Sequence, residues 1–301
     1  MEVTVKELYD EILGSENVKE NEPMKNHISF KVGGNARYYL TPHSVDELIQ
    51  LIAVIREKKE PYYILGNGSN LLVPDEGYQG TIICIGKNLS EITVSDHTIT
   101  AQAGAMLSSI AAKAYEHSLA GFEFASGIPG TLGGAVTMNA GAYGGEMKDV
   151  LTKVTALEKS GQVRVLSRDE LQLGYRTSII PKEELIVLEA QIELEDGNPE
   201  EIRDKMRNFN GRRREKQPLE YPSAGSTFKR PEGYFAGKLI QDAGLKGYQV
   251  GGAQVSEKHS GFVINTGDAT TRDILTLIHD VQEKVYEKFG VTLEMEVKLL
   301  K

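Results

Sequence analysis

The sequence has few of the residues that build several common kinds of protein site. Its one cysteine, Cys84, excludes a disulfide framework and is expected to be a small buried hydrophobic residue within the apolar run 82–85. The six histidines are scattered and lack the spacing of zinc ligands. No apolar run reaches the roughly eighteen residues of a membrane helix, and the first residues lack the apolar core of a secretory signal. These absences favour a cytoplasmic protein without a metal site.

Positive charge is also in short supply. The chain carries 34 lysines and arginines against 43 acidic residues, a formal net charge of −9. This balance disfavours nonspecific binding to nucleic acid or to anionic membranes, but it permits a local cationic pocket for a phosphorylated small molecule. With 301 residues, 40% of them hydrophobic, the chain is long enough for two globular domains.

Glycine, in contrast, is concentrated in two uncharged stretches. Residues 127–145 contain seven glycines and one proline, and a shorter loop of the same kind occupies residues 66–70. Glycine lets the backbone approach a ligand closely, and successive backbone N–H groups can form an anion-binding nest. Two ordinary hairpin turns are the alternative interpretation. The pair of loops favours one elongated, phosphate-bearing cofactor.

The setting of the shorter loop argues against a Rossmann fold. In that fold a glycine loop opens a helix, and an acidic residue follows after about twenty positions. Residues 66–70 instead lie between the apolar runs 62–65 and 71–73, which predicts a strand–loop–strand arrangement.

Apolar periodicity and capping residues predict the helices. Ser44 with Glu47 and Thr270 with Asp273 have the spacing of capping boxes, and Asn198 precedes a proline at a helix start. The predicted helices cover residues 3–13, 44–60, 107–117, 198–214, 234–243 and 270–290.

Strands are predicted from alternation and from short apolar runs. They cover residues 28–32, 37–40, 62–65, 81–85, 92–94, 98–103, 150–158, 163–166, 186–194, 262–265 and 291–300. Residues 14–27 are polar and predict a linker. A change of character after the helix that begins near residue 199 predicts a domain boundary between residues 197 and 217.

Three polar residues are candidates for chemistry. Arg176, beside Tyr175 and small polar residues, can grip a carboxylate through two hydrogen bonds, although a solvated arginine is the default. Ser226 lies in a small-residue loop without the G-x-S-x-G pattern of a hydrolase nucleophile, and a loop hydroxyl bonded to backbone is its alternative. On the last predicted strand, Glu296 and Glu294 share a face, and local sequence does not choose between them.

Taken in order, several motifs resemble one family. They are Gly66-Asn67-Gly68-Ser69-Asn70-Leu71-Leu72-Val73, Gly127-Ile128-Pro129-Gly130, Asn139-Ala140-Gly141-Ala142-Tyr143-Gly144, Tyr175-Arg176, Ala224-Gly225-Ser226-Thr227-Phe228-Lys229 and Glu296-Val297-Lys298. From about Phe30 to Val297 the chain resembles the UDP-N-acetylenolpyruvoylglucosamine reductases, FAD enzymes of bacterial peptidoglycan precursor synthesis. The short path between Arg176 and Pro199 is similar to the shorter subclass, which lacks a tyrosine-bearing loop. Lys298 departs from the arginine common in the family, and a lysine cannot reproduce the planar, two-point grip of an arginine.

The resemblance implies an α+β fold with an FAD-binding domain of the vanillyl-alcohol-oxidase type at residues 1–197, to which the strand 291–301 returns. A smaller α+β substrate-binding domain would cover residues 217–290. The expected cofactors are FAD and NADPH, the expected partner is a small-molecule sugar nucleotide, and the protein is expected to be a monomer. Matching the family's Glu-Val selects Glu296 over Glu294.

The resemblance also implies residue roles. Arg176 and Glu296 would flank the enolpyruvyl carboxylate, and Ser226 would donate a proton after hydride transfer. The implied substrate-binding residues are Tyr175, Lys216, Gly225 and Lys229. The implied FAD-binding residues are Gly66, Asn67, Gly68, Ser69, Asn70, Leu71, Gly127, Ile128, Pro129, Gly130, Thr131, Gly133, Gly134, Asn139, Gly141 and Ala142.

Two rival functions stay open. One is an FAD-linked sugar or alcohol oxidase of the same fold, although neither glycine stretch contains the histidine or cysteine of a covalent flavin link. The other is a sugar-nucleotide-binding protein without redox activity. Reduction of flavin by NADPH, followed by reoxidation with the enolpyruvyl sugar nucleotide, distinguishes all three.

Overall fold

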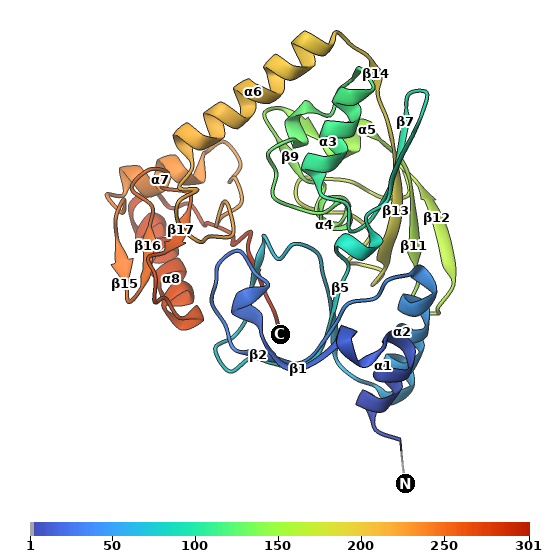
Figure 1. Ribbon diagram of the computed structural model, residues 1–301. Helices are drawn as coiled ribbons and strands as arrows, with labels where there is room; N and C mark the ends of the chain where they lie inside the picture. Colours follow the sequence, from blue (N-terminus) through green and yellow to red (C-terminus); the bar gives the residue numbers. More distant parts are fainter. Residues whose placement is uncertain (1–2) are drawn as a thin grey trace. The chain divides into compact units, whose positions relative to one another are not determined.

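The computed structural model describes residues 3–301, which form two compact units (Figure 1). Unit 1 contains the described residues up to Glu20, together with Tyr38–Asn67 and Gly80–Arg212. Unit 2 contains Asn21–Arg37, Gly68–Gln79 and Arg213–Lys301. These units are defined by contacts within each of them. The functional domains implied by the resemblance stay a prediction.

The helices follow the predicted periodicity closely. The α-helices are α1 (Val5–Leu13), α2 (Val45–Lys58), α3 (Leu107–Glu116), α4 (Leu132–Thr137), α5 (Met147–Val150), α6 (Pro199–Lys216), α7 (Ala236–Asp242) and α8 (Thr271–Phe289). Short 3-10 helices are η1 (Ser15–Asn17), η2 (Met24–Asn26), η3 (Lys87–Leu89) and η4 (Glu123–Ala125). The short helices α4 and α5, within or beside the longer glycine stretch, were not predicted.

The strands are short outside one sheet. They are β1 (Val18–Pro23), β2 (Asn35–Leu40), β3 (Tyr62–Leu65), β4 (Leu71–Leu72), β5 (Tyr78–Cys84), β6 (Ile92–Ser95), β7 (Thr98–Gln102), β8 (Leu119–Ala120), β9 (Gly141–Ala142), β10 (Gly145–Glu146), β11 (Leu151–Leu157), β12 (Val163–Ser167), β13 (Ile186–Glu193), β14 (Glu195–Asp196), β15 (Gln249–Val250), β16 (Ala253–Val255), β17 (Val263–Asn265) and β18 (Lys298–Leu299).

Unit 1 is built on an antiparallel five-stranded sheet with the order β12-β11-β13-β7-β6. Helix α4 contacts β13 and β7, and α3 contacts β6 and β7. Buried side chains of β7 and β11, such as Ile99 and Val154, join those of α3 and α4 in one core. The sheet therefore anchors the helix that lies inside the longer glycine stretch.

Other pairings complete the sheets. A four-stranded sheet has the order β1-β2-β5-β3, in which β3 runs parallel to β5. In unit 2, β15, β16 and β17 form an antiparallel sheet, which contacts α8. Also in unit 2, β18 pairs in parallel with β4.

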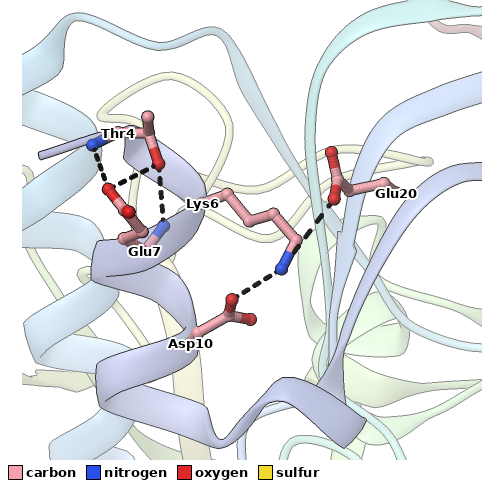
Figure 2. Close-up of polar contacts among 5 residues, drawn as sticks. All are labelled: Thr4, Lys6, Glu7, Asp10 and Glu20. Carbon is pink, nitrogen blue, oxygen red and sulfur yellow. Dashed lines mark hydrogen bonds and ion pairs between the residues drawn. The ribbon is translucent and has the colours of Figure 1, made fainter.

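Capping fixes the first helix, as Figure 2 shows. The Thr4 hydroxyl accepts a hydrogen bond from Glu7 N at 3.2 Å, and the Glu7 carboxylate accepts one from Thr4 N at 2.7 Å. This reciprocal pair satisfies two N–H groups that a helix start leaves unpaired. Lys6 Nζ also contacts Asp10 at 2.6 Å and Glu20 at 3.8 Å. The helix predicted near the amino terminus is confirmed, with its first turn at Val5.

The other predicted caps are confirmed with one exception. Thr270 and Asp273 form the predicted capping box, and Gly290 ends α8 in the left-handed conformation with φ +66°. Ser44 caps α2 by accepting from Glu47 N. However, the Glu47 carboxylate accepts a hydrogen bond from His43 N, not from Ser44 N, so the predicted box is half formed.

Two predictions for residues 14–32 are wrong. The predicted linker contains β1. This strand was missed because it lies at the edge of its sheet, where half of its side chains are exposed and polar. The predicted strand 28–32 is instead a series of turns. Ile28, Phe30 and Val32 are buried as the alternation required, but their backbone finds no neighbouring strand.

The predicted final strand 291–300 is also mostly wrong, although the segment pairs with two partners in turn. Lys229 N donates to Glu294 O and Glu296 N donates to Thr227 O, each at 2.8 Å. Further along, Lys298 N donates to Asn70 O at 3.1 Å, within the short pairing of β18 with β4. Because the partner changes after Glu296, only residues 298–299 form a strand.

Candidate functional site

Gly66 and Asn67, the first residues of the shorter glycine-rich loop, lie in unit 1 and contact the longer loop there. The Asn67 side-chain amide donates to Pro129 O at 2.9 Å. A Cβ placed on Gly66 would lie 2.3 Å from Thr131 Oγ1, so the two loops approach too closely for a side chain there. The strand–loop–strand setting of the shorter loop, between β3 and β4, is confirmed. The sequence therefore brings together the loops that were predicted to share one ligand.

The two loops differ in how their backbone N–H groups are used. In the longer loop, the amides of Ile128, Gly130, Leu132 and Gly133 all donate to backbone carbonyls of the protein. Across residues 3–301, in contrast, no acceptor pairs with the N–H groups of Asn67, Gly68 or Ser69. An anion-binding nest is therefore better supported in the shorter loop than in the first half of the longer one.

A two-residue turn carries Arg176 in unit 1. Gly174 and Thr177 exchange backbone hydrogen bonds, which leaves Tyr175 and Arg176 at the corner. Arg176 has φ +54°, in the left-handed region that disfavours a branched side chain. The guanidinium carbon lies 5.3 Å from the centre of the half-exposed Tyr175 ring, a cation–π distance. The turn thus presents a cation and an aromatic ring together.

Asn139 links this turn to the longer glycine loop. Its side chain is 1% exposed and donates to Gly174 O at 3.0 Å and to the Glu146 carboxylate at 2.9 Å. Its oxygen accepts from Lys148 N at 2.9 Å. Both amide hydrogens are therefore used inside the protein, and any contact of Asn139 with a cofactor would come from other atoms.

Glu146 is a charged neighbour of Arg176 that the sequence analysis missed. The hydrogen bond from Lys148 is the largest cause of a lowered pKa of the Glu146 carboxyl group. The hydrogen bond from Asn139 and the positive charge of Arg176 lower this pKa further, whereas partial burial raises it. The carboxylate is thus held ionised. Glu146 directly follows the uncharged glycine stretch 127–145, seven residues after Asn139. Nothing in the sequence there predicted this role.

In unit 2, Ser226 and Glu296 lie on backbone segments that pair with each other. Glu296 N donates to Thr227 O at 2.8 Å, and Phe228 forms a bridge with Met295. The neighbouring Thr227 is fully buried, and its hydroxyl accepts from Val263 N at 2.9 Å. Ser226 itself is exposed. Two segments of unit 2 that are about 70 residues apart in the sequence, one carrying Ser226 and the other Glu296, are therefore neighbours through main-chain pairing.

The structure distinguishes the two glutamates that local sequence left equal. Glu296 is 8% exposed, and Asn70 donates to its backbone carbonyl at 3.3 Å. The Glu294 side chain is 70% exposed and pairs with Lys229 Nζ at 2.8 Å, a contact that lowers the pKa of the Glu294 carboxyl group. A surface ion pair of this kind has little energetic weight. Glu296 is the better candidate for chemistry.

The remaining predicted substrate residues lie in unit 2. Lys216 is exposed at the end of α6. Gly225 has φ +76° with open space around its Cβ position, so its conformation and not crowding favours glycine there. The ammonium group of Lys229 is held by Glu294, on the exposed side of the paired segments.

Several features bear on other kinds of site. Among residues 3–301, no cluster of three His, Cys, Asp or Glu side chains has the arrangement of a metal site. Within the same residues, no helix is both long enough and apolar enough to cross a membrane. Cys84, at the end of β5, is partly exposed, less buried than predicted. Burial raises the pKa of its thiol, against a hydrogen bond with Tyr39 that lowers it.

Comparison with known proteins identifies relatives over nearly the whole chain. A family model described as an FAD binding domain matches residues 36–167, and one described as the C-terminal domain of UDP-N-acetylenolpyruvoylglucosamine reductase matches residues 217–300. The UDP-N-acetylenolpyruvoylglucosamine reductase of Caldanaerobacter subterraneus subsp. tengcongensis is 58% identical over 290 residues, which cover 96% of each chain.

Solved structures agree. The UDP-N-acetylenolpyruvylglucosamine reductase (MurB) from Thermus caldophilus is 36% identical with a TM-score of 0.81, over 94% of this chain and 98% of that one. The glucose dehydrogenase Phl p 4.0202 has a TM-score of 0.51 at 14% identity, over 65% of this chain and 44% of that one, a likeness of fold alone. The predicted α+β fold with an FAD-binding domain of the vanillyl-alcohol-oxidase type is confirmed.

Proposed function

Because the chain belongs to the UDP-N-acetylenolpyruvoylglucosamine reductase family, we propose that it reduces the enolpyruvyl ether of UDP-N-acetylglucosamine to UDP-N-acetylmuramate with FAD and NADPH. This reaction serves peptidoglycan precursor synthesis. We place it in the cytoplasm, in a monomer that binds neither membrane nor nucleic acid. One structural observation carries the assignment of the site: the buried Glu296 lies on a segment paired with the loop of Ser226.

The shorter glycine loop fits a cofactor that carries a pyrophosphate. Its N–H groups at Asn67, Gly68 and Ser69 lack acceptors within residues 3–301, and side chains are excluded at Gly66 and Gly68 by close neighbours. Such a nest binds phosphate oxygens without a cationic side chain. FAD bound there would supply the hydride-transfer chemistry between NADPH and the substrate.

Arg176 binds the carboxylate of the enolpyruvyl group in this proposal. Hydride addition to the terminal carbon leaves negative charge on the neighbouring carbon, which spreads into that carboxylate. A preorganised cationic donor stabilises such charge by roughly 3–4 kcal/mol. Tyr175, stacked near the guanidinium, limits the positions that Arg176 can adopt.

Ser226 donates the proton that completes the reduction. Its hydroxyl is a weak acid, but the carbanion that it protonates is a strong base. Glu296 helps only as a protonated or proton-sharing group beside the developing negative charge. Lys216 is assigned to the nucleotide diphosphate, and Gly225 and Lys229 to the walls of the substrate site.

An absorbance experiment tests the proposed function. The purified protein with bound FAD should show a flavin spectrum that NADPH bleaches under anaerobic conditions, and the enolpyruvyl sugar nucleotide should restore it with formation of UDP-N-acetylmuramate. Recovery with oxygen but not with this substrate would favour an oxidase. A protein that stays colourless after FAD is added would favour a binding protein without redox activity.

A further inference from the structure

The turn that carries Arg176 is attached to the segment around α4 at two points, both within unit 1. One is the hydrogen bond from Asn139 to Gly174 O, at 3.0 Å. The other is made by Ser178, which is fully buried and donates from its hydroxyl to Thr137 O at 2.7 Å. Residues 137–139 therefore hold both ends of the short segment 174–178.

These attachments matter because the turn holds Arg176 in an unfavourable backbone conformation. Arg176 and Asn139 both have positive φ, +54° and +44°, and a left-handed conformation costs a residue with a side chain about 1–2 kcal/mol. Such a conformation persists only where surrounding contacts determine it. The Asn139 amide bonds the carbonyl that precedes Tyr175, so it restrains the backbone from which the arginine extends.

The same amide also bonds the Glu146 carboxylate, which interacts electrostatically with Arg176. Glu146 accepts from Asn139 at 2.9 Å and from Lys148 Nζ at 2.9 Å, so its charge is already balanced. A Glu146 carboxylate released from these partners would compete with a substrate carboxylate for the arginine. Asn139 therefore restrains both the position of Arg176 and the group that would compensate its charge.

We propose that Asn139 is a positioning residue for substrate reduction, acting through Arg176 by holding Gly174 O and Glu146. This inference rests on the proposed function and deepens it. It moves Asn139 from cofactor contact, the role predicted from sequence, to organisation of the carboxylate site. Asn139 touches neither substrate nor reacting atoms in this role, and Ser178 supports the same turn from its other end.

Asn139→Asp in the full chain with FAD is the test, because aspartate has nearly the same shape and tolerates positive φ but cannot donate to Gly174 O or Glu146. Stopped-flow absorbance separates flavin reduction by NADPH from reoxidation by the enolpyruvyl substrate. We expect reduction within about twofold of wild type and reoxidation slowed by about tenfold or more, the cost of misplacing a catalytic group. Combined with Arg176→Ala, Asn139→Asp should add little further loss.

Asn265→Asp is the matched control. Asn265 is buried in unit 2, donates to Phe30 O at 3.1 Å and accepts from Gly267 N and Ala269 N, so its substitution removes a similar donor that has no bond to the segment 174–178. We expect it to lower the melting temperature without a selective loss of reoxidation. If Asn139→Asp does not retain FAD, Ser178→Ala gives the same test, with a smaller selective loss of reoxidation.

Three outcomes would overturn the inference. They are unchanged reoxidation in Asn139→Asp, an equal selective loss in Asn265→Asp, and losses that multiply fully when Asn139→Asp is combined with Arg176→Ala. Each leaves the proposed function standing if the wild type is reoxidised by substrate. A wild type whose reduced flavin is not reoxidised by substrate would overturn the proposed function, and this inference with it.

Discussion

The turn of Arg176 in unit 1 and the paired segments of Ser226 and Glu296 in unit 2 are held in different ways. Side-chain hydrogen bonds attach the first to its neighbours: Asn139 donates to Gly174 O, and the Ser178 hydroxyl donates to Thr137 O. Main-chain pairing holds the second, from Thr227 to Glu296 and from Lys229 to Glu294. Main-chain pairing survives substitution of the residues concerned, whereas a side-chain contact does not. Unit 2 should therefore tolerate changes at its functional residues, while the position of Arg176 should depend on residues that never touch the substrate.

The largest expected effect comes from Ser226→Ala. The substitution removes a proton donor, and general acid catalysis contributes on the order of 10²- to 10⁴-fold, so reoxidation of flavin by substrate should slow by that factor. Reduction by NADPH should stay within about twofold, and the melting temperature should not change, because main-chain bonds fix the neighbouring residues. Stopped-flow absorbance and thermal unfolding check this. Equal losses in both half-reactions would remove Ser226 from the donor role.

Arg176→Ala should have the next largest effect. Loss of a preorganised charge-stabilising donor slows the chemical step by about 10²- to 10³-fold, here the reoxidation by substrate. Arg176→Lys should recover only part of this loss, because an ammonium group does not grip a carboxylate in the same planar geometry. The measurement is single-turnover reoxidation at saturating substrate. Undiminished reoxidation in Arg176→Ala would show that the arginine is structural.

Two glycines of the shorter loop allow the same comparison, between a side-chain contact and a main-chain contact, in the predicted FAD site. A Cβ on Gly66 would strike the Thr131 side chain, whereas one on Gly68, at φ +62°, would lie 2.2 Å from the backbone oxygen of His27. A side chain can rotate away more easily than a backbone can shift. Gly68→Ala should therefore destabilise the protein more, with overpacking typically costing about 1–3 kcal/mol.

Melting temperature and retained FAD measure both glycine variants. Gly211→Ala is the control, since its Cβ position in α6 is open and alanine favours a helix by about 0.5–1 kcal/mol over glycine. A larger loss in Gly66→Ala than in Gly68→Ala would mean that the Thr131 contact is the more rigid one.

Substitution of His259 should have the smallest effect. It tests whether a side chain also supports the segments around Thr227 and Glu296, which main-chain pairing holds together. Its Nδ1 accepts from Gly261 N at 3.1 Å, and Gly261 O accepts from Thr227 N. Burial lowers the pKa of His259 below its usual 6.5. The neutral ring is therefore favoured in the folded state. Its contribution to the free energy of unfolding is full above about pH 6.5 and is lost as pH falls toward the folded-state pKa.

His259→Asn keeps an acceptor for Gly261 N but cannot be protonated. Its melting temperature should therefore fall less than that of the wild type between pH 7.5 and pH 5.5. His279→Asn, at an exposed histidine of α8, should behave like the wild type. An identical pH dependence in His259→Asn and the wild type would show that this histidine does not couple protonation to stability.

Sequence alone predicted the parts of the fold that depend on local chemistry. The caps at Thr270 and Asn198 are confirmed, because a cap is set by residues within one turn. Strand β1 was missed because an edge strand exposes polar side chains, and the burial pattern of residues 28–32 was right although no strand forms there. Periodicity reports which side chains are buried, but not which backbone they pair with.

The same distinction applies to the site. The two glycine loops and Arg176 could be selected from residue type and resemblance. Nothing local separated Glu296 from Glu294, because burial of one and exposure of the other depend on the pairing with residues 227–229. The hydrogen bond from Asn139 to Gly174 spans 35 residues, and no pattern within either segment predicts it.

Cys84 has a practical consequence. It is the only thiol in the chain, and since burial raises its pKa, little of it is the reactive thiolate near neutral pH. Cysteines introduced at exposed positions should therefore take up maleimide dyes or spin labels much faster than Cys84. One label in each unit, without any change to Cys84, would report by energy transfer or electron resonance how far apart the units stand before and after substrate is added.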